Sequence, residues 1–340
     1  MKPRARDLGI EIGRLRPGRQ NAITDVDGVR VGHTTLVEGD DVRTGVTIVV
    51  PPPEPLFAGC HRINGNGELT GLEWIRDSGL LTTPVALTNT HSVGVVRDAI
   101  IAAMPPDAGD WSLPVVGETW DGFLNDINGF HVRAEHVVAA LESASAGAVA
   151  EGAVGGGTGM ICHGFKGGIG TSSRLLDDGA TIGVLVQANH GQRRRLRVNG
   201  VPVGELIGPD RTPVPKRGAE GAGSIIVVIA TDAPLLPGQC ERLTRRAAFA
   251  IARTGGMAEV SSGDFALCFA TGNRDLGTDV PEVALRMRSD RRINELYEAV
   301  IDGVEESIVN ALLAGEAMTG RDGNTVHALE PELLVEALRS

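Results

Sequence analysis

One serine, Ser224, stands where a charged, proline-rich loop meets an apolar segment, and it is the best-placed nucleophile in the chain. Residues 225–231 are mostly β-branched, which predicts a buried strand because such side chains fit a pleated sheet. Residues 208–220 are rich in turn formers and charge and have little to bury. An ordinary turn would have the same composition, since Gly-Ser pairs are common in turns. The junction also suits a peptide bond, Gly223–Ser224, that the protein cleaves itself.

Cleavage at this bond would create an N-terminal nucleophile. The Ser224 hydroxyl would attack the Gly223 carbonyl, the acyl group would move from nitrogen to oxygen, and water would complete the cut. The freed α-amine, with a pKa of about 7.7–8.0, then serves as the base for its own hydroxyl, so no histidine is needed. Such a site also requires an oxyanion hole and a group that orients the amine. Asn189, at the end of an expected strand, can donate from its amide; Ser262 and Asp264 supply a hydroxyl and a carboxylate.

A second serine, Ser92, competes for the role of nucleophile. It lies between an expected strand and an expected helix, with Gly94 two residues further on. The pattern approaches the nucleophile elbow G-x-S-x-G, but Thr90 stands where the first glycine must permit a sharp turn. His91 and Ser92 are equally compatible with the start of a helix, so both interpretations remain open at this point.

The glycine-rich segment 155–174 invites comparison with a phosphate-binding loop. Lys166 is followed by Gly167 rather than by serine or threonine, so the GxxxxGK[ST] pattern fails, and GxGxxG fails as well. Tight turns between strands, or close approach of the backbone to a ligand, are expected here instead.

The elements that must position these residues are an irregular mixture of strands and helices. Hydrophobic patterning predicts strands at 29–36, 44–50, 84–89, 182–188, 225–231 and 265–270. Helical spacing predicts helices at 72–80, at 132–144, at 236–251 and at 293–312. A further helix is expected to follow the segment 90–94 and to end at about residue 104. The polar residues 117–126 are expected to form a loop with a binding surface. The lack of a regular βαβ rhythm favours layers of sheet covered by helices over a doubly wound fold.

Bulk composition is that of a globular protein of 340 residues, 42% hydrophobic and 22% charged. The net charge of −11 argues against a nucleic-acid partner. No apolar run approaches the ~18 residues of a membrane helix, and no early run has the length of a signal peptide. The four cysteines are far apart and form no CxxC pair, which argues against a zinc knuckle or a disulfide framework and favours a reducing cytoplasm. A basic N-terminal cluster is expected to form a solvated face (Lys2, Arg4, Arg6, Arg14, Arg16, Arg19).

Several motifs, in order along nearly the whole chain, match those of one peptidase family. They lie at 25–33 (DVDGVRVGH), 65–71 (GNGELTG), 88–94 (TNTHSVG), 124–127 (LNDI), 155–160 (GGGTGM), 165–174 (FKGGIGTSSR) and 223–235 (GSIIVVIATDAPL). The chain resembles the family that contains the L-aminopeptidase D-Ala-esterase/amidases and the β-peptidyl aminopeptidases.

The resemblance implies an α+β fold, a four-layer αββα sandwich similar to that of the N-terminal-nucleophile hydrolases but with a different strand connectivity. It implies one domain, residues 1–340, that cleaves itself into an α chain (1–223) and a β chain (224–340). It further implies a homo-oligomer, a tetramer of αβ heterodimers, and neither metal nor cofactor.

The resemblance also assigns catalytic roles to individual residues. Ser224 matches the nucleophile. Ser262 and Asp264 match the pair that orients the nucleophile and its amine. Asn189 matches an amide of the oxyanion hole.

On the substrate side, the resemblance implies an aminopeptidase or amidase for short peptides, amides or esters with a free N-terminal amine. Glu118 matches the carboxylate that holds this amine. Trp120 lies near a position where some members carry a tyrosine, so it would border the substrate without offering a hydroxyl donor. An acyltransferase of related fold, a serine hydrolase that uses Ser92, and a catalytically silent scaffold are the alternatives.

Overall fold

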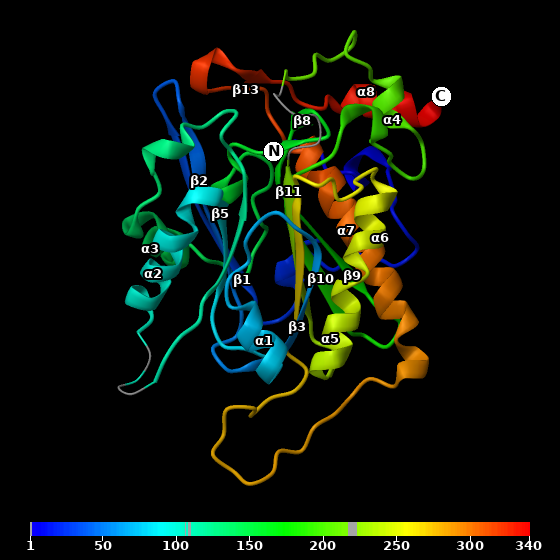
Figure 1. Cartoon of the computed structure of the whole chain (residues 1–340). Coiled ribbons are helices and arrows are strands. Elements are labelled where there is room, and N and C mark those ends of the chain that lie inside the picture. Colours follow the sequence, from blue (N-terminus) through cyan, green and yellow to red (C-terminus); the bar gives the residue numbers. More distant parts are fainter. Residues whose placement is uncertain (1, 106, 108–109, 217–222) are drawn as a thin grey trace.

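The computed structural model describes residues 2–105, 107, 110–216 and 223–340. Two β-sheets lie face to face, and helices cover the outer face of each, so the layers run helix, sheet, sheet, helix (Figure 1). The expected αββα sandwich is thereby confirmed.

The first sheet has the strand order β1-β2-β5-β6, and the second has the order β4-β3-β12-β11-β10-β9. The strands are β1 (Arg30–Glu38), β2 (Val42–Val50), β3 (Leu56–Gly65), β4 (Leu80–Leu81), β5 (Val85–Asn89), β6 (Val115–Thr119), β9 (Gly168–Leu175), β10 (Thr181–Asn189), β11 (Ser224–Thr231) and β12 (Gly263–Ala270). Two short hairpins are β7 (Ile161–Cys162) with β8 (Phe165–Lys166), and β13 (Met318–Thr319) with β14 (Thr325–Val326). Strand β11 is antiparallel to β10 and parallel to β12. The start of β11 therefore lies beside the end of β10 and the start of β12.

Strand β11 is apolar on both faces because it lies between two layers of hydrophobic core. Its odd-numbered residues, from Ile225 to Ile229, join the core against the helices. Its even-numbered residues, from Ile226 to Ala230, join the core between the two sheets. A strand covered on both faces shows no polar alternation, which explains the uninterrupted run that predicts it. By the same period of two, Ser224 belongs to the face that is turned toward the first sheet.

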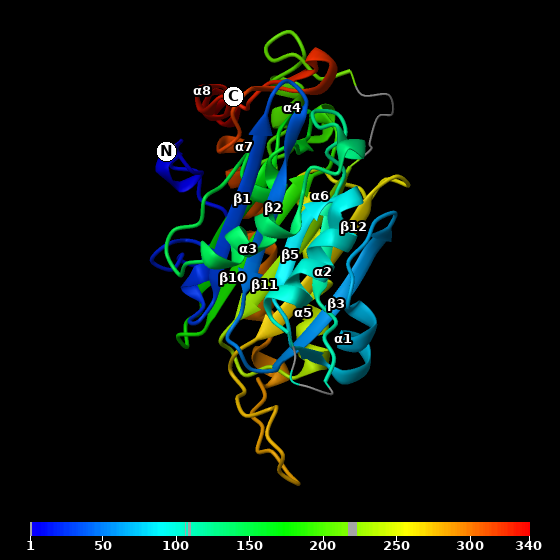
Figure 2. The same cartoon turned by 90° about the vertical axis from the view of Figure 1, so that its left-hand side faces the viewer.

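Helices α2 and α3 cover the first sheet, while α5, α6 and α7 cover the second (Figure 2). The helices are α1 (Leu72–Ser78), α2 (Val93–Ala103), α3 (Ala134–Glu142), α4 (Val203–Leu206), α5 (Pro237–Thr244), α6 (Ala247–Arg253), α7 (Asn294–Leu313) and α8 (Pro331–Arg339). Helix α7 packs on β9 at Gly170, where a Cβ would lie 1.9 Å from the Ser307 carbonyl oxygen. Within the described parts of the chain, no helix has the length and apolarity needed to cross a membrane.

Three expectations about local structure are only partly right. The glycine-rich segment contains a full strand, β9, because its glycines let α7 approach closely rather than only forming turns. The polar segment after residue 116 is not all loop, since β6 continues to Thr119 and carries Glu118. Segment 236–251 forms two helices, α5 and α6, instead of one. The sequence pattern does not reveal the break at Arg245–Arg246, because the apolar residues on both sides of it keep the helical spacing.

Part of the basic N-terminal cluster is anchored rather than solvated, which corrects a further expectation. Arg4 pairs with Glu151 at 2.7 Å, and Arg6 pairs with Glu306 at 3.1 Å. Glu306 also pairs with Arg174 at 2.7 Å, and both of these side chains are 0% exposed. Because a buried carboxylate needs partners, these contacts tie the N-terminal segment to α7 and β9.

Candidate active site

Ser224 is the first residue of β11 and lies opposite Asn189, the last residue of β10. The side chain is buried, and its Oγ accepts a hydrogen bond of 3.0 Å from the N–H of Gly263, the first residue of β12. Three neighbouring strand ends thus meet at one serine hydroxyl.

The residue before the serine must lack a side chain. A Cβ on Gly223 would lie 1.9 Å from the Asn189 carbonyl oxygen and 3.2 Å from the Cα of His190. No other residue fits without moving the end of β10. The glycine therefore brings the Gly223–Ser224 peptide against the strand end that carries Asn189.

Ser262 and Asp264 lie together next to the start of β11, where Ser224 is the first residue. Asp264 is opposite Ile225 in the β11–β12 register, and its Oδ1 accepts a hydrogen bond of 3.2 Å from the Ile225 N–H. The Ser262 hydroxyl donates to the same oxygen at 2.5 Å. Burial raises the pKa of Asp264 to about 6, while the hydrogen bond from Ser262 acts in the opposite direction. The structure thus brings the predicted pair next to the nucleophile.

The side-chain amide of Asn189 is oriented at both ends. Its Oδ1 accepts a hydrogen bond of 2.8 Å from the Ile161 N–H, and its Nδ2 donates to the Trp120 carbonyl at 2.9 Å. The NH₂ end of the amide is therefore turned toward the segment that follows β6. A donor is held beside the strand end that faces Ser224, as an oxyanion hole requires.

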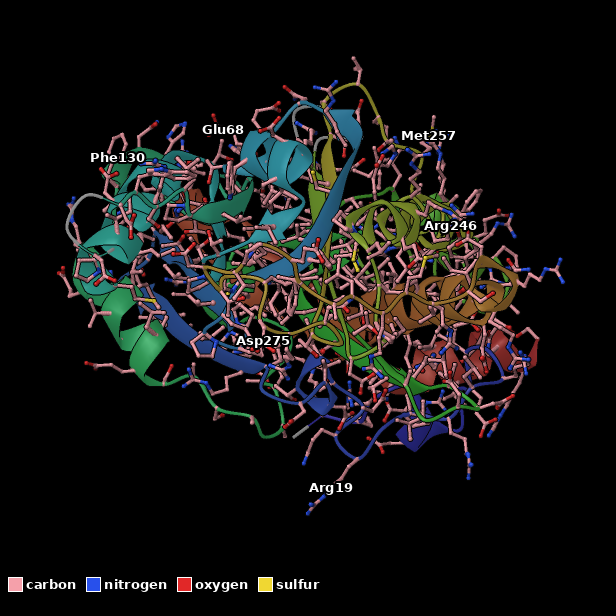
Figure 3. The ribbon with its side chains drawn as sticks, turned by 90° about the horizontal axis from the view of Figure 1, so that it is seen from below. Arg19, Glu68, Phe130, Arg246, Met257 and Asp275 are labelled. Atoms are coloured by element: carbon pink, nitrogen blue, oxygen red, sulfur yellow. The ribbon has the colours of Figure 1, made fainter. Side chains whose placement is uncertain are left out.

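Glu118 comes from the first sheet and is only 2% exposed. Its Oε1 accepts a hydrogen bond of 3.0 Å from the Glu68 N–H, and its Oε2 accepts one of 2.5 Å from the Thr90 hydroxyl. Burial raises the pKa of Glu118, while these two hydrogen bonds lower it. The side chain of Glu68 itself is exposed, at the edge of the molecule in Figure 3.

Two glycines, Gly67 and Gly263, lie between Glu118 and Ser224. A Cβ on Gly67 would lie 2.7 Å from the Glu118 Oε1 and 3.0 Å from the Cα of Gly263. Gly263 in turn donates to the Ser224 hydroxyl. Only one glycine contact therefore separates the buried carboxylate from the group that binds the nucleophile, which places both in one site.

Sequence reasoning missed three contributors to this site: Thr90, Gly67 and Gly263. In the sequence Thr90 only weakens the elbow pattern around Ser92, whereas in the structure it donates to Glu118. The sequence holds a signal for them, because Gly67 and Thr90 lie in the motifs at 65–71 and 88–94 and Gly263 lies between the predicted residues Ser262 and Asp264.

The surroundings of Ser92 and Trp120 differ from those of Ser224. Ser92 is buried at the start of α2, and the neighbouring His91 stacks on Phe130 with ring centroids 6.0 Å apart. Trp120 is 39% exposed; its carbonyl binds Asn189, and it therefore lies at the border of the site. The described residues contain one cluster with metal-ligand chemistry, Cys162, His163 and His190, and it lies outside the set predicted for catalysis.

The sequence profile of peptidase family S58 matches residues 21–326. The chain belongs to peptidase family S58.

Individual S58 relatives agree with this assignment. The chain is 45% identical to a beta-peptidyl aminopeptidase, BapA, of Sphingosinicella microcystinivorans, over 96% of this chain and 89% of the relative. Its structure is similar to a beta-aminopeptidase of a Burkholderia species, with a TM-score of 0.93, 54% identity and coverage of 99% and 98%. It is also similar to the L-aminopeptidase D-Ala-esterase/amidase of Ochrobactrum anthropi, a serine aminopeptidase with a variant of the Ntn hydrolase fold, with a TM-score of 0.92, 44% identity and the same coverage. The S58 chain is accordingly a hydrolase of the aminopeptidase class with an Ntn-type fold.

Proposed function

We propose that this S58 aminopeptidase activates itself by cleaving the Gly223–Ser224 bond and then uses Ser224 as its nucleophile. The observation that carries the proposal is the position of Ser224 at the junction of three strand ends. Its hydroxyl is bound by the Gly263 N–H, and it lies opposite the oriented amide of Asn189. Ser92 has none of these contacts in the described structure.

Self-cleavage converts one amide into an ester and then into two chain ends. The Ser224 Oγ attacks the Gly223 carbonyl carbon, the C–N bond breaks, and its nitrogen becomes the α-amine of Ser224. Water then hydrolyses the ester, which leaves a carboxylate on Gly223 and restores the Ser224 hydroxyl. The tight packing of Gly223 against Asn189 supports this step, because it holds the scissile peptide beside an amide donor.

Turnover repeats the same attack on a substrate. The new α-amine takes the proton of the Ser224 hydroxyl, and the hydroxyl oxygen forms an acyl-enzyme with the substrate carbonyl. The α-ammonium then gives the proton to the leaving amine. The Asn189 amide stabilises the oxyanion, and the Ser262–Asp264 pair orients the amine end of Ser224. Support for the second role is the hydrogen bond of Asp264 to the adjacent Ile225 N–H.

Glu118 selects substrates with a free amine. Its buried carboxylate has hydrogen bonds from Glu68 and Thr90, and an ammonium group supplies the opposite charge that it lacks. An N-acylated substrate offers no charge and adds bulk. Among such substrates, the names of the relatives, beta-peptidyl aminopeptidase, beta-aminopeptidase and L-aminopeptidase D-Ala-esterase/amidase, favour N-terminal β-amino acids, L-amino acids or D-Ala. Amides of β-Ala, L-Ala and D-Ala would distinguish these classes.

The proposal extends to assembly and location. A homo-oligomer, specifically a tetramer of cleaved αβ heterodimers, is proposed from the family resemblance, and sedimentation of the purified protein tests it. A reducing cytoplasm is proposed because Cys60, Cys162, Cys240 and Cys268 are all buried and unbridged. Cell fractionation tests the location.

The deciding experiment is mass analysis of the purified chain under denaturing conditions. We expect two species, residues 1–223 and 224–340, in place of the 35.5 kDa chain. Ser224→Ala should remain whole and inactive, whereas the control Ser92→Ala should be cleaved and active. A fully active chain that stays at 35.5 kDa would refute self-cleavage, and an active Ser224→Ala protein would refute the nucleophile.

A further inference from the structure

Cys162, His163 and His190 form a buried cluster that the aminopeptidase mechanism does not use. One ligand-type atom from each of them lies within 4.8 Å of the others. The Sγ of Cys162 is 3.8 Å from the Nδ1 of His190, close to the separation of about 3.6 Å that tetrahedral bonds to a shared zinc ion would give. The imidazole rings of His163 and His190 meet edge to face, with centroids 5.1 Å apart.

The two histidines have donor or acceptor atoms that the protein leaves unmatched. The Nε2 atoms of His163 and His190 are buried and have no hydrogen-bond partner among the described residues. Buried polar atoms are normally satisfied, so the unmatched Nε2 of His163 is open to a metal ion, whereas His190 would bind the ion through the Nδ1 that lies beside Cys162. A neutral imidazole has the free lone pair that a metal ion binds.

His163 is the first of the two turn residues in the β7–β8 hairpin. The β7–β8 hairpin pairs Cys162 with Phe165 across the two turn residues His163 and Gly164, whose φ angles are +49° and +71°. Two positive φ values define a type I′ turn, for which Asn-Gly is the preferred sequence. A histidine at the first position is an uncommon choice. It directs an imidazole toward Cys162 and His190, and the turn alone does not require it.

Two residues of the cluster are neighbours, in the chain, of the residues that position the Asn189 side chain. Cys162 follows Ile161, whose N–H holds the Asn189 Oδ1 at 2.8 Å, and His190 follows Asn189 itself. The His163 N–H adds a hydrogen bond of 2.7 Å to the His190 carbonyl. A shift of Cys162 or His190 on metal binding is therefore passed to Ile161, which holds the Asn189 Oδ1, and to the backbone of Asn189 itself.

We propose that Cys162, His163 and His190 bind one thiophilic d¹⁰ metal ion, Zn²⁺ or Cu⁺, and that the bound ion inhibits the enzyme through Asn189. Thiolate and imidazole are the ligands that these ions share. On binding, the Cys162 S–H bond breaks, an S–metal bond forms and one proton leaves to the buffer. The three ligands complete a trigonal site for Cu⁺ and leave a fourth position for water on Zn²⁺.

The inhibitory part rests on the proposed function, whereas the binding part does not, so metal content is measured first. The full chain is kept reduced without free metal and titrated anaerobically with Zn²⁺ or with Cu⁺, each against a chromogenic chelator. We expect one ion per chain, with loss of at least tenfold in affinity in Cys162→Ala and in His163→Asn. The asparagine variant keeps the favoured residue of the type I′ turn, so it tests the ligand without disturbing the hairpin. Cys60→Ala, which removes a buried thiol outside the cluster, is the matched control and should bind as the wild type does.

Activity is then compared with and without the ion for each protein. Since loss of an oxyanion-hole donor costs about 10²–10³ in kcat, a displaced Asn189 should lower kcat by tenfold or more and leave KM nearly unchanged. Neither ion bound at one per chain, or equal binding by Cys162→Ala, would overturn the site. Binding that leaves kcat unchanged would overturn the coupling to Asn189.

Discussion

Replacing Glu118 by glutamine removes one charge from the site and almost nothing else. The glutamine Oε1 can keep the hydrogen bond from the Glu68 N–H, and its NH₂ group can donate to the Thr90 hydroxyl oxygen. Since the side chain is 2% exposed and of the same shape, the packing around it is retained. Any loss of activity in Glu118→Gln therefore reports on charge.

The size of the loss follows from the contact that the substrate ammonium would make. Two unit charges 4 Å apart at an effective dielectric of 20 attract each other by about 4 kcal/mol. Desolvation of the ammonium offsets part of this, which leaves about 3 kcal/mol. Because about 1.4 kcal/mol corresponds to a factor of ten, kcat/KM for free-amine substrates should fall by about a hundredfold.

The assay measures kcat/KM for β-Ala and L-Ala p-nitroanilides and for their N-acetyl forms, across pH. In the wild type the free-amine preference should weaken as the pH falls toward the raised pKa of Glu118, since protonation removes the charge; in Glu118→Gln this acid limb should disappear. Glu68→Gln is the control, because the exposed side chain of Glu68 (Figure 3) acts on Glu118 only through its charge, which contributes to the raised pKa of Glu118, and the hydrogen bond comes from the backbone N–H that the variant keeps. An undiminished preference for free amines in Glu118→Gln would refute the assignment.

Two further predictions concern Ser224 and its surroundings, and a third concerns the buried ion pair between β9 and α7. The pKa of Asp264 rises from 3.8 to about 6 on folding, so this group stabilises the fold fully below pH 3.8 and that stability is lost as the pH rises through 6. Asp264→Asn should therefore gain up to about 3 kcal/mol over the wild type between pH 4 and pH 8 in urea unfolding, while self-cleavage slows; a pH-independent difference would contradict this. Gly223→Ala should slow self-cleavage by tenfold or more, because the new methyl group would lie 1.9 Å from the Asn189 carbonyl oxygen, and a normal rate of chain separation would exclude that contact. Arg174→Met should lower the free energy of unfolding by about 3 kcal/mol because it leaves the buried Glu306 short of a partner; a change below about 1 kcal/mol would show that the remaining partners suffice.

The sequence predicts the elements whose pattern is set by burial alone. Strand β11 is recognisable because both of its faces are covered, and α7 because one long face meets the second sheet. Strand β9 was not predictable in this way. Its glycines and serines have low strand propensity, and it is a strand because α7 approaches the backbone at Gly170. Contacts between distant segments override local preference there.

The site, too, combines residues that can be predicted from the sequence with contacts that cannot. Chemical logic singles out Ser224, and the motifs of the resembled family supply the roles of Asn189, Asp264 and Glu118. No spacing in the chain shows that Glu118, on the first sheet, meets Ser224, on the second, because that depends on how two sheets stack. The Cys162 cluster is hidden for the same reason, since its ligands come from a hairpin and from the end of a distant strand.

The proposed site residues come from both sheets. Ser224, Asp264 and Asn189 all belong to the second sheet and keep their mutual geometry through backbone pairing. Glu118 belongs to the first sheet, which packs on the second where a Cβ on the preceding Gly117 would lie 3.2 Å from Ile226. A change that separates the sheets at this contact should move Glu118, the proposed amine-binding carboxylate, but leave Ser224 with Asp264 and Asn189. The proposed self-cleavage needs no substrate amine, so apolar substitutions between the sheets should lower aminopeptidase turnover and leave cleavage of the chain intact.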